Sequence, residues 1–207
     1  MIQSVFKEAE ISFDQLDVIA VGTGPGSFTG LRIGIGIAQA LAYSHNIPII
    51  TLSTLEMIAL SCQNALNANV TIASDQHQEG IIHVALDARM KEVYYAAFQF
   101  NSSQCSRLTV TEEIKLITPD QISLNETTQN NSSNYFCGNG WLEYADKFST
   151  LSLPLENIID IYWPQSDMTV KYIEKHLNDI ETIEWNDLKA EYVRNDVAKK
   201  SSKKTLI

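Results

Sequence analysis

The sequence lacks several features that define large classes of protein. Its three cysteines, Cys62, Cys105 and Cys137, are widely spaced and form no CxxC pair, which favours reduced thiols over a disulfide framework or a zinc site. Every apolar run is far shorter than the roughly 20 residues of a membrane-spanning helix, and the N-terminus MIQSVFKEAE does not resemble a signal peptide. These absences predict a cytoplasmic protein with no metal site and no contact with a membrane.

The motifs of hydrolytic enzymes are missing as well. The histidines are scattered, without the HExxH or HxxxH spacing of a metallopeptidase. No GxSxG nucleophile elbow occurs, because Ser27 in GPGS has no glycine two positions later. A lone histidine in an apolar stretch, such as His83, is predicted to be a structural residue with satisfied hydrogen bonds.

Basic residues are in short supply. The chain has 25 acidic and 15 basic residues, a net charge of −10, so it repels phosphate backbones and is expected to reach any nucleic acid only indirectly. One basic cluster lies in the C-terminal tail, at Arg194, Lys199, Lys200, Lys203 and Lys204. The tail is either a solvated, frayed terminus or a contact for phosphate or a partner.

What is present in the first third is an alternating pattern of strands and helices. Asp17–Gly22 and Ile47–Leu52 are short runs rich in Val, Ile or Leu, typical of buried strands. A helical pattern from Ser27 to Ser44 lies between them, and a capping box of Ser53 and Glu56 begins a second helix. This order predicts an α/β fold with a parallel sheet.

A polar stretch between Asn67 and Gly80 separates this pattern from a second one, which predicts a first lobe over residues 1–78 and a second α/β lobe over residues 79–207. The second lobe ends in a helix and the basic tail. Its strands are predicted at Ile81–Asp87, Glu92–Phe100, Leu108–Ile117, Tyr135–Cys137 and Ile158–Trp163, with helices near Trp141–Phe148 and after Ser166.

A glycine-rich loop, GTGPGSFTG, precedes the first long helix. Free backbone N–H groups and the helix dipole make this position suitable for an anion, and the candidate phosphate contacts are Gly24, Gly26, Ser27 and Thr29. The loop lacks the lysine of a P-loop, and its glycines do not follow GxGxxG. The alternative is a tight turn in which Ser27 caps the helix.

The helix itself is apolar over about two-thirds of its circumference, against the stripe of about 100° that a core-facing surface helix needs. Ile33, Ile37, Ala40 and Leu41 form one apolar face. The other face consists of Phe28, Leu31, Gly34, Ile35, Ala38 and Ala42. So wide an apolar arc favours a protein partner on this helix, and the alternative is a helix buried within its own lobe.

Four segments resemble the TsaB (YeaZ) family, in the order in which they occur in that family: VGTGPGSFTGLRIGIGIAQALA, IPIITLSTLEMIA, ALDARMKEVYYAAFQ and YVRNDVAKK. The resemblance implies a two-lobed actin-like or sugar-kinase-like fold, related to ribonuclease H, without catalytic residues of its own. Family members begin with a strand hairpin carrying an early Asp. This sequence opens at what resembles the middle of the following helix, so either Met1 is internal or the first lobe is truncated, with exposed strand edges.

The resemblance also implies a function. The chain would be a dimerisation or scaffold subunit that pairs with a TsaD-type catalytic subunit and a TsaE-type ATPase, in a complex that transfers threonylcarbamoyl to adenosine in tRNAs reading A-starting codons. The chain would need no cofactor itself, and ATP would act at the level of the complex. The resemblance places the partner face on the side of the first long helix that bears Phe28, Leu31, Ile35 and Ala38. Without its partner, the chain would pair with a second copy of itself through the same face, and it would contact tRNA only indirectly.

Two alternatives remain open at this point. In an actin-fold ATP-binding phosphotransferase, Asp87 and Arg89 in the predicted hairpin would join the Gly24–Ser27 loop in holding phosphate. The opposing interpretation is a turn aspartate paired with Arg89 or Lys91. The second alternative is a glycoprotease-like peptidase, and the missing hydrolase motifs argue against it.

Overall fold

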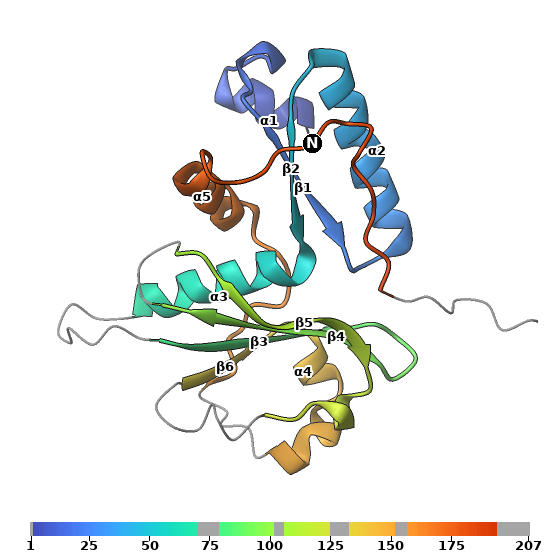
Figure 1. Ribbon diagram of the computed structural model, residues 1–207, viewed down its shortest axis with the longest axis vertical. Helices are drawn as coiled ribbons and strands as arrows, with labels where there is room; N and C mark the ends of the chain where they lie inside the picture. The colour runs from blue at the N-terminus through green and yellow to red at the C-terminus, as the bar shows by residue number, and fades with distance from the viewer. Residues whose placement is uncertain (1, 70–78, 102–105, 125–132, 152–156, 194–207) are drawn as a thin grey trace, which may run out of the picture.

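The structure is a computed structural model, and it describes residues 2–69, 79–101, 106–124, 133–151 and 157–193. Its elements fall into a small parallel sheet with two helices and a larger mixed sheet with helices on both faces (Figure 1). This arrangement confirms the predicted α/β class. Within the described residues, no helix has the length and hydropathy needed to cross a bilayer.

The small sheet pairs β1 (Ile19–Gly24) with β2 (Ile49–Ser53) in parallel, and α2 (Phe28–His45) connects the two strands. The short helix α1 (Ile2–Ala9) precedes them and contributes no buried residue. Helix α2 ends at Asn46, which adopts the left-handed conformation with a φ of 53°. Asparagine tolerates this conformation better than most residues, which explains why the helix stops at the predicted position.

The larger sheet has the strand order β5-β4-β3-β6. Its strands are β3 (Gly80–Asp87), β4 (Val93–Phe100), β5 (Thr109–Ile117) and β6 (Ser133–Cys137). Neighbours pair antiparallel except for β3 and β6, which are parallel. Helix α3 (Thr54–Asn69) lies along one face, and α4 (Gly140–Glu143) with the 3-10 helix η4 (Ala145–Leu151) covers the other (Figure 1).

Helix α5 (Ser166–His176) packs against α3, and the chain then returns to the small sheet. Ile183 exchanges two backbone hydrogen bonds with Ile49, of 2.8 and 2.9 Å, and so extends the sheet beyond β2. We call residues 183–193 the C-terminal strap. The lobe boundary at residue 78 remains a prediction. The strap and α5 belong to the predicted second lobe by sequence, but both contact elements that precede residue 78.

Most predicted elements are confirmed, and two differ from the expectation. The capping box is present, with the Glu56 N–H donating to the Ser53 hydroxyl at 3.0 Å. The predicted strand Ile158–Trp163 is reduced to a single bridge between Ile158 and Phe136. The helix predicted near Trp141–Phe148 is divided into α4 and η4. The basic tail and Cys105 lie outside the described residues.

Candidate functional site

Three surface features are candidates for a functional site: helix α2 with the strap beside it, a cavity at the β3–β4 hairpin, and an acidic cleft. The start of α2 is fixed by Ser27, whose hydroxyl accepts a hydrogen bond from the Gly30 N–H at 3.3 Å. Ser27 is therefore a helix cap, as one of the two sequence interpretations had it.

The face of α2 predicted to bind a partner is largely turned inward. Ile35, Ala38 and Ala42 are buried with Ile49 and Leu188 in the core of the small sheet. The sheet and the strap cover these three residues, so this part of the predicted partner face is not exposed in the structure, and the partner face stays a prediction. Of the other predicted residues, Phe28 and Gly34 are exposed and Leu31 is half-buried.

The opposite side of α2 is apolar and exposed. Ile33 is 58% exposed and Ile37 is 44% exposed, and Ala40 lies on the same side of the helix. Gly34 and Gly36 have only open space where a side chain would be. We call Ile33, Gly34, Ile37 and Ala40 the outward face of α2. A second element can approach this face closely, because the backbone is bare at the glycines.

The strap runs alongside α2 (Figure 1) and is fastened to it by side chains. The Gln39 amide donates to the backbone oxygens of Trp185 and Leu188, both at 3.2 Å. The Arg32 Nε donates to the Tyr192 hydroxyl at 3.0 Å. Sequence reasoning missed this feature, since the strap has no periodic pattern, although it includes the first residues of the family-like segment YVRNDVAKK.

The hairpin cavity has a volume of about 610 Å³ and lies between the N-terminus of α2 and the β3–β4 hairpin. Gly26, Ser27, Asp87 and Arg89, four of the six candidate phosphate contacts, line it together. Gly24 and Thr29 are not among its lining residues. Gly24 has a φ of 120°, and a Cβ there would lie 3.0 Å from the Glu191 backbone oxygen, so this glycine serves the path of the chain.

Both oxygens of Asp87 are engaged within the protein. Oδ1 accepts from the Arg89 N–H at 2.8 Å and from the Tyr144 hydroxyl at 2.7 Å, and Oδ2 lies 3.3 Å from the Arg89 guanidinium. Desolvation and this carboxylate raise the pKa of Tyr144 to about 12. The interpretation of Asp87 as a turn residue paired with Arg89 is confirmed, and this pairing competes with any role for either group in holding phosphate.

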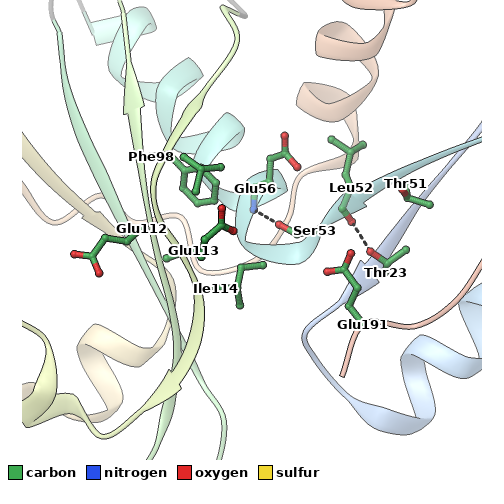
Figure 2. Close-up of a pocket in the computed structure, with 12 residues that line it drawn as sticks. Thr23, Thr51, Leu52, Ser53, Glu56, Phe98, Glu112, Glu113, Ile114 and Glu191 are labelled. Atoms are coloured by element: carbon green, nitrogen blue, oxygen red, sulfur yellow. Dashed lines mark hydrogen bonds between the residues drawn. The ribbon is translucent and has the colours of Figure 1, made fainter. Parts of the chain in front are cut away.

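The acidic cleft, of about 280 Å³, lies between the end of β2 and strand β5 (Figure 2). Glu56 at the start of α3, Glu113 on β5 and Glu191 on the strap line it, together with the hydroxyls of Thr23 and Ser53. The neighbouring Glu112 also contributes, and its carboxylate contacts Lys115. This cleft disfavours phosphate, because its charges are all negative or paired.

Burial is the main reason why the pKa of Glu56 in this cleft is raised. Desolvation raises the pKa of Glu56, a hydrogen bond from the Ser53 backbone N–H to its carboxylate lowers it, and the charge of Glu191 raises it further. Sequence reasoning missed the pair, since Glu56 and Glu191 are far apart along the chain and meet only because the strap returns to β1, where the Glu191 N–H donates to the Thr23 oxygen at 2.9 Å.

The histidine singled out in the sequence is structural. His83 is buried, its Nδ1 lies 2.8 Å from the Tyr95 hydroxyl, and its Nε2 lies 3.0 Å from Asn134 Oδ1. Desolvation lowers its pKa, so the ring is neutral at physiological pH. Among the residues that the structure describes, no three His, Cys, Asp or Glu side chains gather in a way that would hold a metal ion.

Comparison with known proteins gives matches over most of the chain. A family model described as "TsaD: tRNA N6-adenosine threonylcarbamoyltransferase" matches residues 1–181. The tRNA threonylcarbamoyladenosine biosynthesis protein TsaB of Haemophilus influenzae is 30% identical over 206 residues, which cover 95% of this chain and 78% of that protein. The TsaB protein of Escherichia coli is 29% identical, covering 96% of this chain and 79% of that protein.

The fold has solved counterparts. A crystal structure from Pseudomonas aeruginosa, described as an uncharacterized protein with similarity to peptidase YEAZ, superposes with a TM-score of 0.75. The match covers 94% of this chain and 81% of that one, at 24% sequence identity. This likeness confirms the predicted two-lobed fold class.

Proposed function

Because the chain belongs to the TsaB (YeaZ) family, we propose that it is a non-catalytic subunit of the machinery that makes threonylcarbamoyladenosine in tRNA. Its relatives carry that biosynthetic role in their names. The family model that matches residues 1–181 describes the transferase itself, so this chain and a TsaD-type enzyme share a fold. In our proposal the TsaD-type subunit is the partner, and a TsaE-type ATPase joins the pair in the cytoplasm.

The exposed apolar outward face of α2 is the observation that carries this proposal. Ile33 and Ile37 point away from the chain's own core, and the adjacent glycines leave room for a helix to pack closely. A TsaD-type protein with the same fold has a corresponding helix, so the two can pair face to face about a pseudo-twofold axis. A second copy of this chain offers the same surface and is the competing occupant.

The hairpin cavity supports the proposal that this chain is a non-catalytic subunit. Asp87, the acidic residue of the phosphotransferase hypothesis, is held by Tyr144 and Arg89, and Gly24 is committed to the path of the chain. No lysine from the described residues lines that cavity. We therefore propose that ATP acts on other subunits of the complex and that this chain reaches tRNA through them.

The test is pairing with the TsaD-type protein encoded in the same genome, measured by size-exclusion chromatography with light scattering. We expect Ile33→Glu to weaken the pairing about 100-fold or more, because a charge would be desolvated at the centre of the interface. Val170→Glu on α5 is the matched control, since Val170 is 59% exposed against 58% for Ile33. Both variants should keep the melting temperature of the wild type.

Three results would decide the matter. Pairing lost in Ile33→Glu and kept in Val170→Glu supports the outward face of α2 as the docking surface. Pairing kept in both variants contradicts that surface. Failure of the wild-type chain to pair with the TsaD-type protein contradicts the proposed function itself.

A further inference from the structure

A groove of about 490 Å³ lies between α2 and the strap, next to the outward face of α2. Its floor is apolar and includes Ile35, Leu188 and Ala190. Both charged side chains that line it are cationic, Arg32 from α2 and Lys189 from the strap. An apolar floor flanked by two cations suits an apolar segment that carries a negative charge.

Arg32 is held in place before any ligand arrives. Its Nε donates to the Tyr192 hydroxyl at 3.0 Å, and the carbon of its guanidinium lies 3.8 Å from the centre of the Phe28 ring. A guanidinium fixed in this way loses less conformational entropy when it binds, and its planar fork matches a carboxylate with two hydrogen bonds.

Among the described residues, no carboxylate neutralises either cation. Within the part of the chain that the structure describes, Arg32 and Lys189 form no ion pair, although the whole sequence carries a net charge of −10. In so acidic a protein, two unpaired cations at the edge of an apolar groove are a local reversal of charge. Such a reversal favours an anionic partner at this place and disfavours it elsewhere on the surface.

We propose that this groove binds an apolar segment of the TsaD-type subunit that carries a carboxylate, with Arg32 and Lys189 as its cationic contacts. The inference rests on the proposed function and extends the docking surface from α2 onto the strap. Gly36 lines the groove and has open space where a side chain would be, so the backbone of the segment can approach closely.

A protein segment fits this groove better than the phosphate backbone of tRNA. The floor is apolar, and phosphate contacts would gain nothing from it, whereas apolar side chains flanking a carboxylate would be buried. The net charge of −10 also repels a long polyanion, while a single carboxylate needs only the two local cations.

The experiment measures the dissociation constant for the TsaD-type subunit by isothermal titration calorimetry at two salt concentrations. One variant is Lys189→Gln, which removes one charge. The other is the double variant Arg32→Gln/Lys189→Gln, which removes both charges. The control is Lys171→Gln, at an exposed lysine of α5. Lys189 and Lys171 are exposed, so their single variants should melt at the wild-type temperature. The double variant also loses the Arg32–Tyr192 hydrogen bond that fastens the strap, so it is compared with Tyr192→Phe, which loses the same hydrogen bond and keeps both charges.

We expect the double variant to bind about 10- to 100-fold more weakly than the wild type, and Lys189→Gln to show a smaller loss. The affinity of the double variant should also depend less on salt, because its charges no longer contribute. Lys171→Gln should bind as the wild type does.

The groove proposal is overturned if the double variant binds within about twofold of the wild type while Ile33→Glu abolishes pairing. In that case the proposed function stands and the groove plays no part. It is also overturned if the double variant pairs normally but the assembled complex loses affinity for tRNA, since phosphate would then be the ligand. A wild-type chain that does not pair contradicts both proposals.

Discussion

At the scale of single residues, the acidic cleft shows how the return of the strap changes a carboxylate. Glu56 lies at the start of α3, where its own helix favours a negative charge. Burial and Glu191 act against that charge and raise the pKa of Glu56 above its ordinary value. The pKa is raised overall because desolvation is the largest of these contributions.

The sign of the resulting pH dependence follows from this raised pKa. A carboxyl group with a higher pKa in the folded than in the unfolded state contributes stability that is fully present below the unfolded pKa. That contribution is lost as the pH rises through the folded pKa. Above its folded pKa, the ionised Glu56 is therefore a charge that folding has made unfavourable.

We expect Glu56→Gln to melt at a higher temperature than the wild type at pH 7.5, by a few degrees at about 2–4 °C per kcal/mol for a chain of this size. The difference should shrink as the pH is lowered toward 4, where wild-type Glu56 is protonated. Differential scanning calorimetry across this range measures it. Glu113→Gln, at an exposed position of the same cleft, is the control. A constant difference at all pH values would contradict the assignment.

At the scale of elements, the β3–β4 hairpin holds an unusual turn. Arg89, Met90 and Lys91 have φ values of 63°, 56° and 64°, a left-handed conformation that residues other than glycine rarely adopt. Asp87 stabilises this turn by accepting the Arg89 N–H and by pairing with its guanidinium. The Tyr144 hydroxyl fixes the same carboxylate to the segment between α4 and η4.

We expect Asp87→Ala to lower the free energy of unfolding by about 1–3 kcal/mol, because the turn loses its acceptor and Tyr144 loses its partner. Urea denaturation followed by circular dichroism measures the change, with Asp120→Ala at an exposed position as the control. An unchanged midpoint would show that the turn does not need the carboxylate, and would reopen Asp87 as a residue kept for ligand binding.

Much of the secondary structure was predictable, but the orientation of α2 was not. The strands β1 to β5 and the helices α2 and α3 follow from local patterns and caps such as Ser27 and Ser53. Both sides of α2 are apolar, so hydrophobic periodicity cannot tell which side faces the core. The answer depends on the strap, whose residue Leu188 packs on Ile35 from far along the sequence. The groove beside Arg32 was hidden for the same reason.

At the scale of the whole molecule, α3 and the strap join the two sheets. Helix α3 buries one face of the larger sheet, and Leu52 and Leu60 share a cluster with Tyr172 of α5. The strap then closes the core of the small sheet. The proposed docking face on α2 is thereby linked through packed elements to the hairpin cavity, which the N-terminus of the same helix lines.

The overall charge sets the expected behaviour toward tRNA. A net charge of −10 is repelled by a polyanion, and the cations of the groove are too few to offset it. We expect the isolated chain to leave fluorescently labelled tRNA unbound at about 150 mM salt, where the Debye length is about 8 Å. Fluorescence anisotropy measures this directly.

Adding the TsaD-type subunit should produce binding, and the Ile33→Glu variant should contribute nothing to it beyond what that subunit achieves on its own. The paired and unpaired variants have nearly the same charge, so a difference between them reports assembly rather than electrostatics. Tight binding of tRNA by the isolated chain would contradict an indirect role and would direct attention to the basic residues of its C-terminal tail.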